Sequence, residues 1–323
     1  MSGSQAAKTK SKKILTGAVT FFKRLYKEKP LGAFGFTVMV LFILVAIFAP
    51  VLSPYGLNDT NPVDRLIAPC AEYPFGTDNL GRDILSRVIY GTRTSIIVGL
   101  TSAVLAVVVA TLIGVSSGYL SGKFDMLVQR FVDAVLCVPL LILLIVIISM
   151  AGAGTMTLIL VMGIRSGIAM SRVIRGATIS IRGNTYIRAA VATGCTRTRI
   201  VMRHIVPNIM AEILIVFATR VPQLILLEAS LSFLGFGVVP PTPSWGGMLS
   251  GSGANYMFQA PWMVVWPGLA LVVLVYSVNM FADALRDIVD PKLRGSSEAS
   301  DYRQPSSKKI RRITKGYTEL NLQ

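Results

Sequence analysis

Few residues of this 323-residue chain have the types and spacing that catalysis or metal binding requires. The single histidine, His204, excludes a metal site built from two histidines. Asp133 and Glu228 are acidic residues in or beside the apolar segments that precede Asp283, and nothing in the sequence pairs them. Catalysis inside a membrane needs a nucleophile with its base or a pair of carboxylates. We therefore expect no catalytic residue, no metal site and no enzymatic activity.

Two further patterns are missing from the sequence. It has no G-x-x-x-x-G-K-[ST] loop for binding phosphates. Its three cysteines, Cys70, Cys137 and Cys195, lack the C-x-x-C spacing of zinc and redox sites, and the spans described below separate them, so no disulfide is expected. The sequence thus predicts that the chain itself binds no cofactor.

Glu228 stands out because it lies in a long apolar segment. A carboxylate within a membrane span is costly and faces protein or water. Three roles are open to it: it lines a pathway, it pairs with Arg220 two turns earlier, or it bonds to a neighbouring span. Arg165 and Arg220, also within apolar segments, fit structural or snorkelling roles.

A second charged group follows a proline-rich stretch between the first two apolar segments. It consists of Asp78, Arg82, Asp83 and Arg87. Asp78 is predicted to cap a short helix, in which Asp83 and Arg87 lie at positions i and i+4. This helix is either an outer gate or partner contact, or a solvated element whose charges pair with one another.

The elements that position these residues are membrane spans. Hydrophobic residues make up 53% of the chain and charged residues 15%, whereas a soluble surface needs about 25–35% charged residues. Six stretches are long and apolar enough to cross a hydrocarbon core of about 30 Å. They are residues 31–52, 94–120, 134–150, 154–171, 213–239 and 261–282. The sequence therefore predicts an all-α polytopic membrane protein with six transmembrane helices.

The basic residues determine the orientation of these helices. Lys and Arg number eight in residues 1–30, seven in 172–203 and nine in 285–323, whereas residues 239–260 carry no charge. Cytoplasmic loops are enriched in Lys and Arg, so both termini are predicted inside and residues 53–93 outside. The net charge of +16 follows from this topology, and no nucleic-acid partner is expected.

Four regions follow from the topology. The first is a cytoplasmic basic tail with a helix over residues 14–27 that lies on the bilayer surface. A first span with an outer loop, a core of five spans with a cytoplasmic loop at 185–207, and a second basic tail come next. The regions are residues 1–30, 31–93, 94–286 and 287–323. Both tails are predicted to contact the anionic inner leaflet of the lipid bilayer.

The cytoplasmic loop 185–207 has the pattern of a docking element. Ala189 and Ala190 give a stretch of small residues that ends at Gly194, a typical helix C-cap. A second amphipathic stretch leads to Pro207, which suits the start of a new span. The loop is either a low-profile lever that enters a groove of a partner or a helix pair at the membrane surface.

This loop resembles the E-A-A-x(3)-G-x(9)-I-x-L-P loop of permease subunits in ATP-binding-cassette (ABC) importers. The matching residues are Ala189, Ala190, Gly194 and Pro207. We assign the apolar position to Ile205, and Val206 takes the leucine position. Arg188 stands where the family has glutamate, which reverses a charge in the contact that the resemblance implies with an ATPase subunit. Either the partner carries a compensating acid or the contact is lost.

Further segments resemble the dipeptide, oligopeptide and nickel permeases, and among them the C-type subunit. They are residues 74–95 (P-F-G-T-D-N-L-G-R-D-I-L-S-R and Y-G-T-R-T-S), 227–237 (L-E-A-S-L-S-F-L-G-F-G), 243–246, 261–262 and 283–291. The resemblance implies a type I importer permease of a bacterial or archaeal inner membrane. It also implies a second permease subunit, two ATP-binding subunits that use ATP and Mg, and an extracytoplasmic binding protein. The cargo would be peptides or similar small solutes, nickel complexes included.

Two other classes of protein compete with this one. An ion-coupled secondary transporter has more spans, inverted repeats and ionisable residues at the midplane of the membrane. A scaffold or sensor would use the loop 185–207 for binding alone. The importer permease is the interpretation that the motifs favour.

Overall fold

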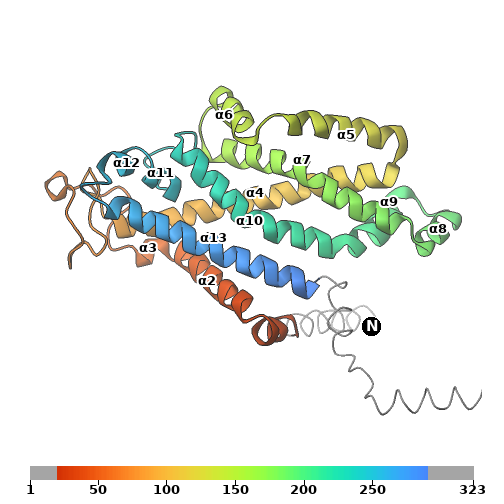
Figure 1. The fold of residues 1–323 in the computed structure, drawn as a ribbon, viewed down its shortest axis with the longest axis horizontal. Coiled ribbons are helices and arrows are strands. Elements are labelled where there is room, and N and C mark those ends of the chain that lie inside the picture. The colour runs from red at the N-terminus through yellow and green to blue at the C-terminus, as the bar shows by residue number, and fades with distance from the viewer. Residues whose placement is uncertain (1–19, 290–323) are drawn as a thin grey trace, which may run out of the picture.

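The computed structural model describes residues 20–289 (Figure 1). Residues 1–19 and 290–323, which hold most of both predicted basic tails and the start of the predicted surface helix, lie outside the described residues. Residues 20–28 are helical. Leu25 of this helix is fully buried against the first and last long helices of the chain, so the end of the surface helix is packed on the bundle.

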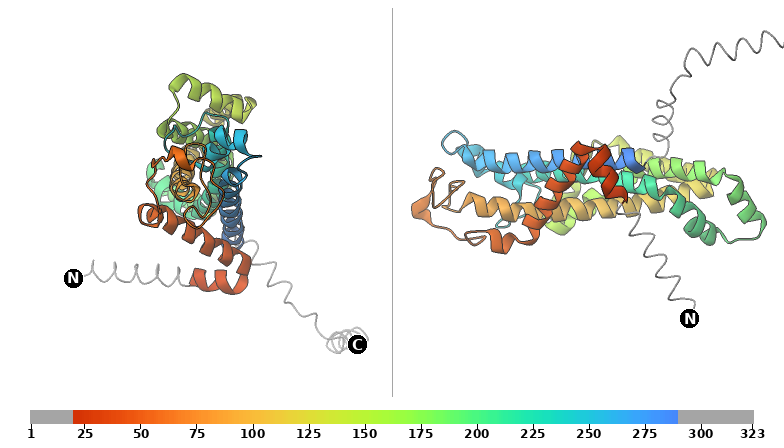
Figure 2. Two further views of the ribbon diagram at one scale, coloured as in Figure 1. Left: turned by 90° about the vertical axis from the view of Figure 1, so that its left-hand side faces the viewer. Right: turned by 90° about the horizontal axis from the view of Figure 1, so that it is seen from below.

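Helices account for all the regular structure of the described residues. The long helices are α2 (Pro30–Ile47), α4 (Ile84–Leu120), α5 (Gly122–Cys137), α7 (Thr155–Arg182), α10 (Met210–Phe233) and α13 (Trp262–Val289). The short ones are α3 (Ala49–Leu52), α6 (Leu140–Ala151), α8 (Thr185–Ala192), α9 (Arg197–Ile200), α11 (Trp245–Leu249) and α12 (Ser252–Tyr256). The long helices lie side by side, with the loop before α4 at one end of the molecule and α8 at the other (Figures 1 and 2).

The number of crossings follows from the ends of the bundle. Five helices are long and apolar enough to span a membrane, and a sixth span is counted if α5 and α6 form one bent crossing. Lys29 before α2 lies 2.6 Å from Asp287 in α13, so both ends of the described chain lie on the same side. An even number of crossings is required for this, which makes α5 and α6 one span and confirms six.

The third span differs from its prediction. A straight helix over 134–150 is wrong: the chain bends by 88° between α5 and α6. Pro139 lies at the bend, where it lacks a backbone N–H and disfavours helical geometry at the preceding residue. Asp125 and Asp133 of α5 pair with arginines of α7. These two aspartates, which precede the predicted span 134–150, therefore attach α5 to the bundle.

Helices α4 and α7 run in the same direction and pack along a seam of glycines. A Cβ on Gly114 would lie 2.6 Å from the carbonyl oxygen of Ser171, and one on Gly167 would lie 2.6 Å from that of Ala106. Within a membrane, small residues are what allow backbones to approach this closely. The α5–α6 crossing lies between these two parallel helices in sequence and returns the chain to the outer side.

Most helices extend beyond their predicted spans. Helix α4 begins at Ile84 rather than at residue 94, so the predicted short outer helix is the first part of a span. Helices α7 and α13 continue to Arg182 and Val289. A run of apolar residues marks only the part of a helix that lies in the hydrocarbon. A helix that continues into water extends beyond that run.

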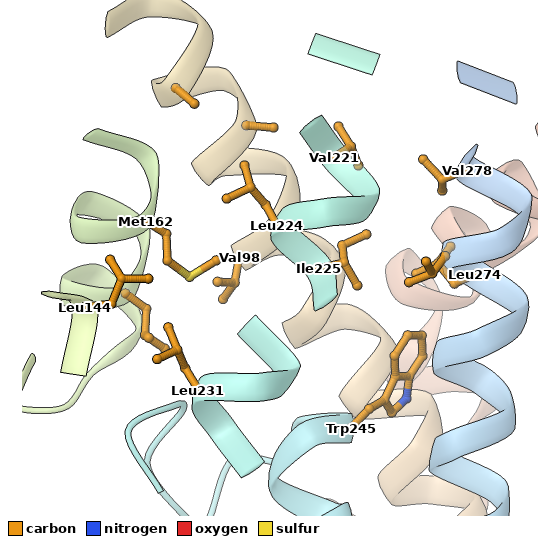
Figure 3. Packing of buried hydrophobic residues seen from close by; sticks show 14 of the residues in the cluster. Val98, Leu144, Met162, Val221, Leu224, Ile225, Leu231, Trp245, Leu274 and Val278 are labelled. Carbon is orange, nitrogen blue, oxygen red and sulfur yellow. The ribbon is translucent and has the colours of Figure 1, made fainter. Parts of the chain in front are cut away.

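The main core lies in the outer half of the bundle (Figure 3). Trp245 of α11 is fully buried and donates its indole N–H to the carbonyl of Val88 at 3.1 Å. Leu224 of α10 and Leu274 of α13 contribute to the same cluster. The core thus joins the loop helix α11 to α4, α6, α7, α10 and α13 and holds the outer end of the bundle together.

Candidate functional site

The loop that resembles the importer motif forms a projecting helix with one anchored face. In α8 the side chain of Ile187 is 2% exposed, whereas Ala189 is exposed. Ile200 and Ile205 are fully buried in the same apolar cluster, which also contains Ile174 of α7. One side of the loop is therefore fixed to the spans, with Ala190 partly buried against the same cluster, and the side with Ala189 is open to solvent.

Gly194 ends α8 in a conformation that favours glycine. Its φ is +78°, and its N–H bonds to the carbonyl of Val191 at 3.0 Å. The N–H of Cys195 bonds to the carbonyl of Ala190 at 3.1 Å. These bonds close a left-handed helix cap, which confirms the predicted C-cap. Thr196 then caps α9 through its hydroxyl, at 3.4 Å from the N–H of Arg199.

Pro207 lies at the start of the 3-10 turn that leads into α10, as predicted for the start of a span, within a helical path that is continuous from α9. A π-helical segment, Val201–Ile205, and a 3-10 turn, Val206–Ile209, join α9 to α10. Proline has no N–H for the i→i−4 ladder, so the helix changes its pitch around this residue. Motion of the loop would therefore pass directly into α10.

The spacing of the importer pattern also corrects the assignment of its apolar position to Ile205. Nine residues after Gly194 end at Arg203, so the isoleucine position of the importer pattern falls on His204. Ile205 is its neighbour, and its side chain is the fully buried one. The apolar anchor is thus displaced by one residue from the pattern.

Arg188 has a role within its own chain. Its guanidinium donates to the carbonyl oxygen of Gly183 at 3.1 Å, just after the end of α7. Together with Arg182 and Arg197 it lines a cavity of about 380 Å³, and no acidic residue lines that cavity. A glutamate at this position could not donate to the carbonyl. The charge reversal therefore makes the base of the loop strongly basic.

Glu228 is fully buried between α10 and α4. Its carboxylate accepts hydrogen bonds from the hydroxyls of Ser95 at 3.0 Å and Ser232 at 2.7 Å. Of the three roles predicted for it, the bond to a neighbouring span is the one observed. Pairing with Arg220 is wrong, because that guanidinium contacts the sulfur of Met170 at 2.9 Å. Removing the side chain would leave two buried hydroxyls without an acceptor.

We expect Glu228→Leu to lower the free energy of unfolding by about 1–3 kcal/mol, the cost of orphaned buried polar groups. Glu228→Gln keeps an acceptor oxygen for Ser95 or Ser232 and is expected to cost less than about 1 kcal/mol. Thermal unfolding of the purified variants measures both effects. If Gln proves as damaging as Leu, a negative charge is required, and the carboxylate has a role beyond joining two spans.

The loop after α10 closes onto the end of that helix. Gly235 ends α10 with φ +86°. A Cβ on Gly237 would lie 1.8 Å from the hydroxyl of Ser232, and one on Gly246 would lie 2.2 Å from the carbonyl of Ala229. These glycines serve close approach within the subunit. The loop is thereby held over Ser232, one of the two serines that bind Glu228.

The outer charged group is organised differently from its prediction. Asp83, and not Asp78, caps α4, accepting from the N–H of Ser86 at 2.7 Å. Asp78 instead bonds to Arg82 at 2.6 Å and lies 3.7 Å from Arg87. The predicted i,i+4 pair of Asp83 and Arg87 is therefore wrong, since both arginines are oriented by Asp78.

The rest of the outer loop is folded against the bundle. Trp262 at the start of α13 donates its indole N–H to the carbonyl of Thr77 at 3.0 Å. The phenol of Tyr73 donates to Asp64 at 2.9 Å, and this bond to a carboxylate raises the pKa of Tyr73. Arg65 bonds to the hydroxyl of Tyr256 at 2.7 Å. The loop is thus a structured cover over the outer end of the spans.

One feature of the outer side had no signal in the sequence. A cavity of about 380 Å³ lies between the turn with Asp78, the start of α4 and the loop after α10. Its walls come from residues 78–87, 232–252 and Met263, which are far apart in the chain. Only the closure of the loop over α10 brings them together.

These features define a class of protein. Six crossings with both ends on one side, a helical loop projecting at that side and a folded cover at the other describe a polytopic membrane protein. The comparisons are more specific. The chain belongs to the family described as binding-protein-dependent transport system inner membrane component, whose model matches residues 110–295. Residues 20–69 match the N-terminal TM domain of oligopeptide transport permease C.

Curated relatives agree with this family over most of the chain. The dipeptide transport system permease protein DppC of Alkalihalophilus pseudofirmus is 39% identical over 273 residues, covering 84% of this chain and 89% of the relative. The oligopeptide transport system permease protein OppC of Bacillus subtilis is 36% identical, covering 83% and 88%. The glutathione transport system permease protein GsiD of Pectobacterium atrosepticum is 34% identical, covering 88% and 94%. The chain is therefore a multi-pass inner-membrane permease, as its motifs predicted.

A solved structure supports the fold. A chain of the MetNI methionine ABC transporter, in an inward facing conformation, superposes with a TM-score of 0.53. It shares 18% identity and covers 63% of this chain and 96% of its own. At this identity the likeness concerns the fold alone, which is that of a type I importer permease.

Proposed function

We propose that this chain is one of two permease subunits that together form the pathway of a peptide importer. An extracytoplasmic binding protein delivers the peptide, and two ATP-binding subunits use ATP and Mg to drive its passage. The observation that carries the proposal is the loop 185–207, together with the names of the relatives. Those names concern dipeptide, oligopeptide and glutathione transport.

The geometry of the loop suits transmission of motion from an ATPase. Helix α8 follows α7 after two residues, and the helical path from α9 runs into α10 without a break. A displacement of the exposed face of α8 would therefore act on two spans at once. Such rigid-body movement is how a pathway exchanges inward-facing and outward-facing states.

Arg188 defines the chemistry of the ATPase contact in this proposal. It lines a basic cavity with Arg182 and Arg197, and its guanidinium donates to the carbonyl of Gly183 at the end of α7. An acidic side chain from the ATPase subunit would complement this cavity. Of the two alternatives for the reversed charge, the compensating acid is the one we adopt.

The test is reconstitution of the complete complex in proteoliposomes. ATP-dependent uptake is measured with a labelled dipeptide, a longer peptide, glutathione and a nickel chelate, each with the binding protein present. Uptake of a peptide that requires ATP and the binding protein is expected. Uptake that follows a proton gradient without ATP, or hydrolysis with no peptide uptake in any arm, would reject the proposal.

A further inference from the structure

The outer cavity described above carries an excess of positive charge on mostly buried groups. Arg82 and Arg87 line it, and Asp78 is the acidic residue among its walls. The side chains of the two arginines are 15% and 11% exposed, respectively. Two guanidinium groups against one carboxylate leave one positive charge without a partner in this cavity.

Arg87 is the residue with unused donors. Its Nε lies 3.7 Å from Asp78, which is an ion pair without a short hydrogen bond. Its Nη1 is buried and has no hydrogen-bond partner among the described residues. A buried cationic donor without a partner is costly. An anionic group entering the cavity would remove that cost.

The shape of the cavity selects a small ligand. Its volume of about 380 Å³ falls within the range of about 300–1,000 Å³ found for small-molecule sites. The arginines are too deeply placed for a flat protein surface to reach them. Ser232, at the outer end of α10, is part of the wall. The site therefore lies where a solute arriving from outside meets the end of a span.

We propose that this cavity binds the terminal carboxylate of a peptide in transit, with Arg87 as the main donor and Arg82 beside it. The assignment rests on the proposed function, in which the cargo is a peptide. Guanidinium groups bind carboxylates through two parallel hydrogen bonds. The terminal carboxylate is the group that all peptides share whatever their side chains. A site for it would accept peptides of many sequences at the entrance to the pathway.

The binding step is tested without transport. Ser252, on the wall of the cavity, is replaced by cysteine in the assembled complex after Cys70, Cys137 and Cys195 are changed to serine. The cysteine is labelled with an anionic and with a cationic methanethiosulfonate reagent. We expect Arg87→Gln to lower the ratio of anionic to cationic labelling rates about tenfold, as removal of one nearby charge implies. Arg87→Lys should retain most of the ratio.

Peptide probes then identify the ligand. Trialanine at millimolar concentration is expected to slow labelling, whereas its C-terminal amide is not. Arg65→Gln is the matched control, because Arg65 bonds to Tyr256 in the same outer region and does not line the cavity. Its labelling ratio should not change. If Arg87→Gln does not fold, Arg82→Gln with the same reagents provides the comparison.

Three results would overturn the proposal. One is an unchanged labelling ratio in Arg87→Gln, and another is equal protection by trialanine and its amide. The third is weaker docking of the binding protein in Arg87→Gln with no change in protection by trialanine, which would assign the arginines to protein docking. Because labelling needs no ATP and no uptake, a complex that fails to import peptides can still show the carboxylate site. A complex that imports peptides can also lack the carboxylate site, so the two proposals can fail independently of each other.

Discussion

Gly194→Asp is expected to lower peptide uptake by the reconstituted complex at least tenfold while the membrane bundle stays folded. No atom lies within 4 Å of a Cβ built on Gly194, so the substitution creates no clash inside the chain. The backbone φ of +78° is strained for any other residue, although aspartate tolerates this conformation better than most. The main effect is a new carboxylate on the exposed face beside Ala189. In the proposed complex, the ATPase subunit approaches that face closely.

The control for this variant is Gly152→Asp. Gly152 also has a positive φ, +89°, and no atom within 4 Å of a Cβ, and it follows α6 at the outer side of the bundle, away from the loop 185–207. Both variants therefore introduce the same charge at a glycine with a positive φ. ATP hydrolysis, co-purification of the ATPase subunits and uptake are measured for each, with monodisperse elution as the check on folding. Unchanged uptake in Gly194→Asp would mean that coupling takes place elsewhere in the complex.

The sequence predicted the features that local chemistry controls. Six apolar stretches and the distribution of arginines were sufficient for the number of spans, because the hydrocarbon core and the positive-inside rule act on each segment independently. Gly194 could be placed at the end of a helix because glycine alone enters the left-handed region at little cost. The family resemblance rested on the same local motifs, and the comparisons confirm it.

The errors have a shared physical cause. The apolar run over 134–150 does not reveal the bend at Pro139, because hydropathy reports how apolar the residues are and not whether the helix axis is straight. Asp78 and Asp83 are both acceptable helix caps by type, and only the folded turn shows which of them meets a free N–H. Several partners for Glu228 were equally compatible with the sequence, and the choice of Ser95 depends on how α4 and α10 pack. The outer cavity depends on residues separated by more than a hundred positions, so no local pattern could indicate it.

Gly114→Val is expected to destabilise the bundle more than Glu228→Leu does. A Cβ on Gly114 would lie 2.6 Å from the carbonyl oxygen of Ser171 and 2.9 Å from the backbone nitrogen of Arg175. These are backbone atoms of α7, so relief requires the whole helix to move away from α4. Overpacking of a core costs about 1–3 kcal/mol, and more where neighbours cannot shift. We therefore expect a loss of about 3 kcal/mol or more, at the upper end of that range.

Gly176→Val is the matched control, because Gly176 lies within α7 itself, is exposed, and has no atom within 4 Å of a Cβ. Both variants replace a helical glycine by the same β-branched residue, so the backbone entropy that each removes from the unfolded chain is similar. The unfolding temperature falls by about 2–4 °C for each kcal/mol of lost stability. Gly114→Val should therefore unfold about 10 °C below the unmodified protein, whereas Gly176→Val should unfold close to the temperature of the unmodified protein. Equal midpoints for the two variants would show that α4 and α7 are not in direct contact at Gly114.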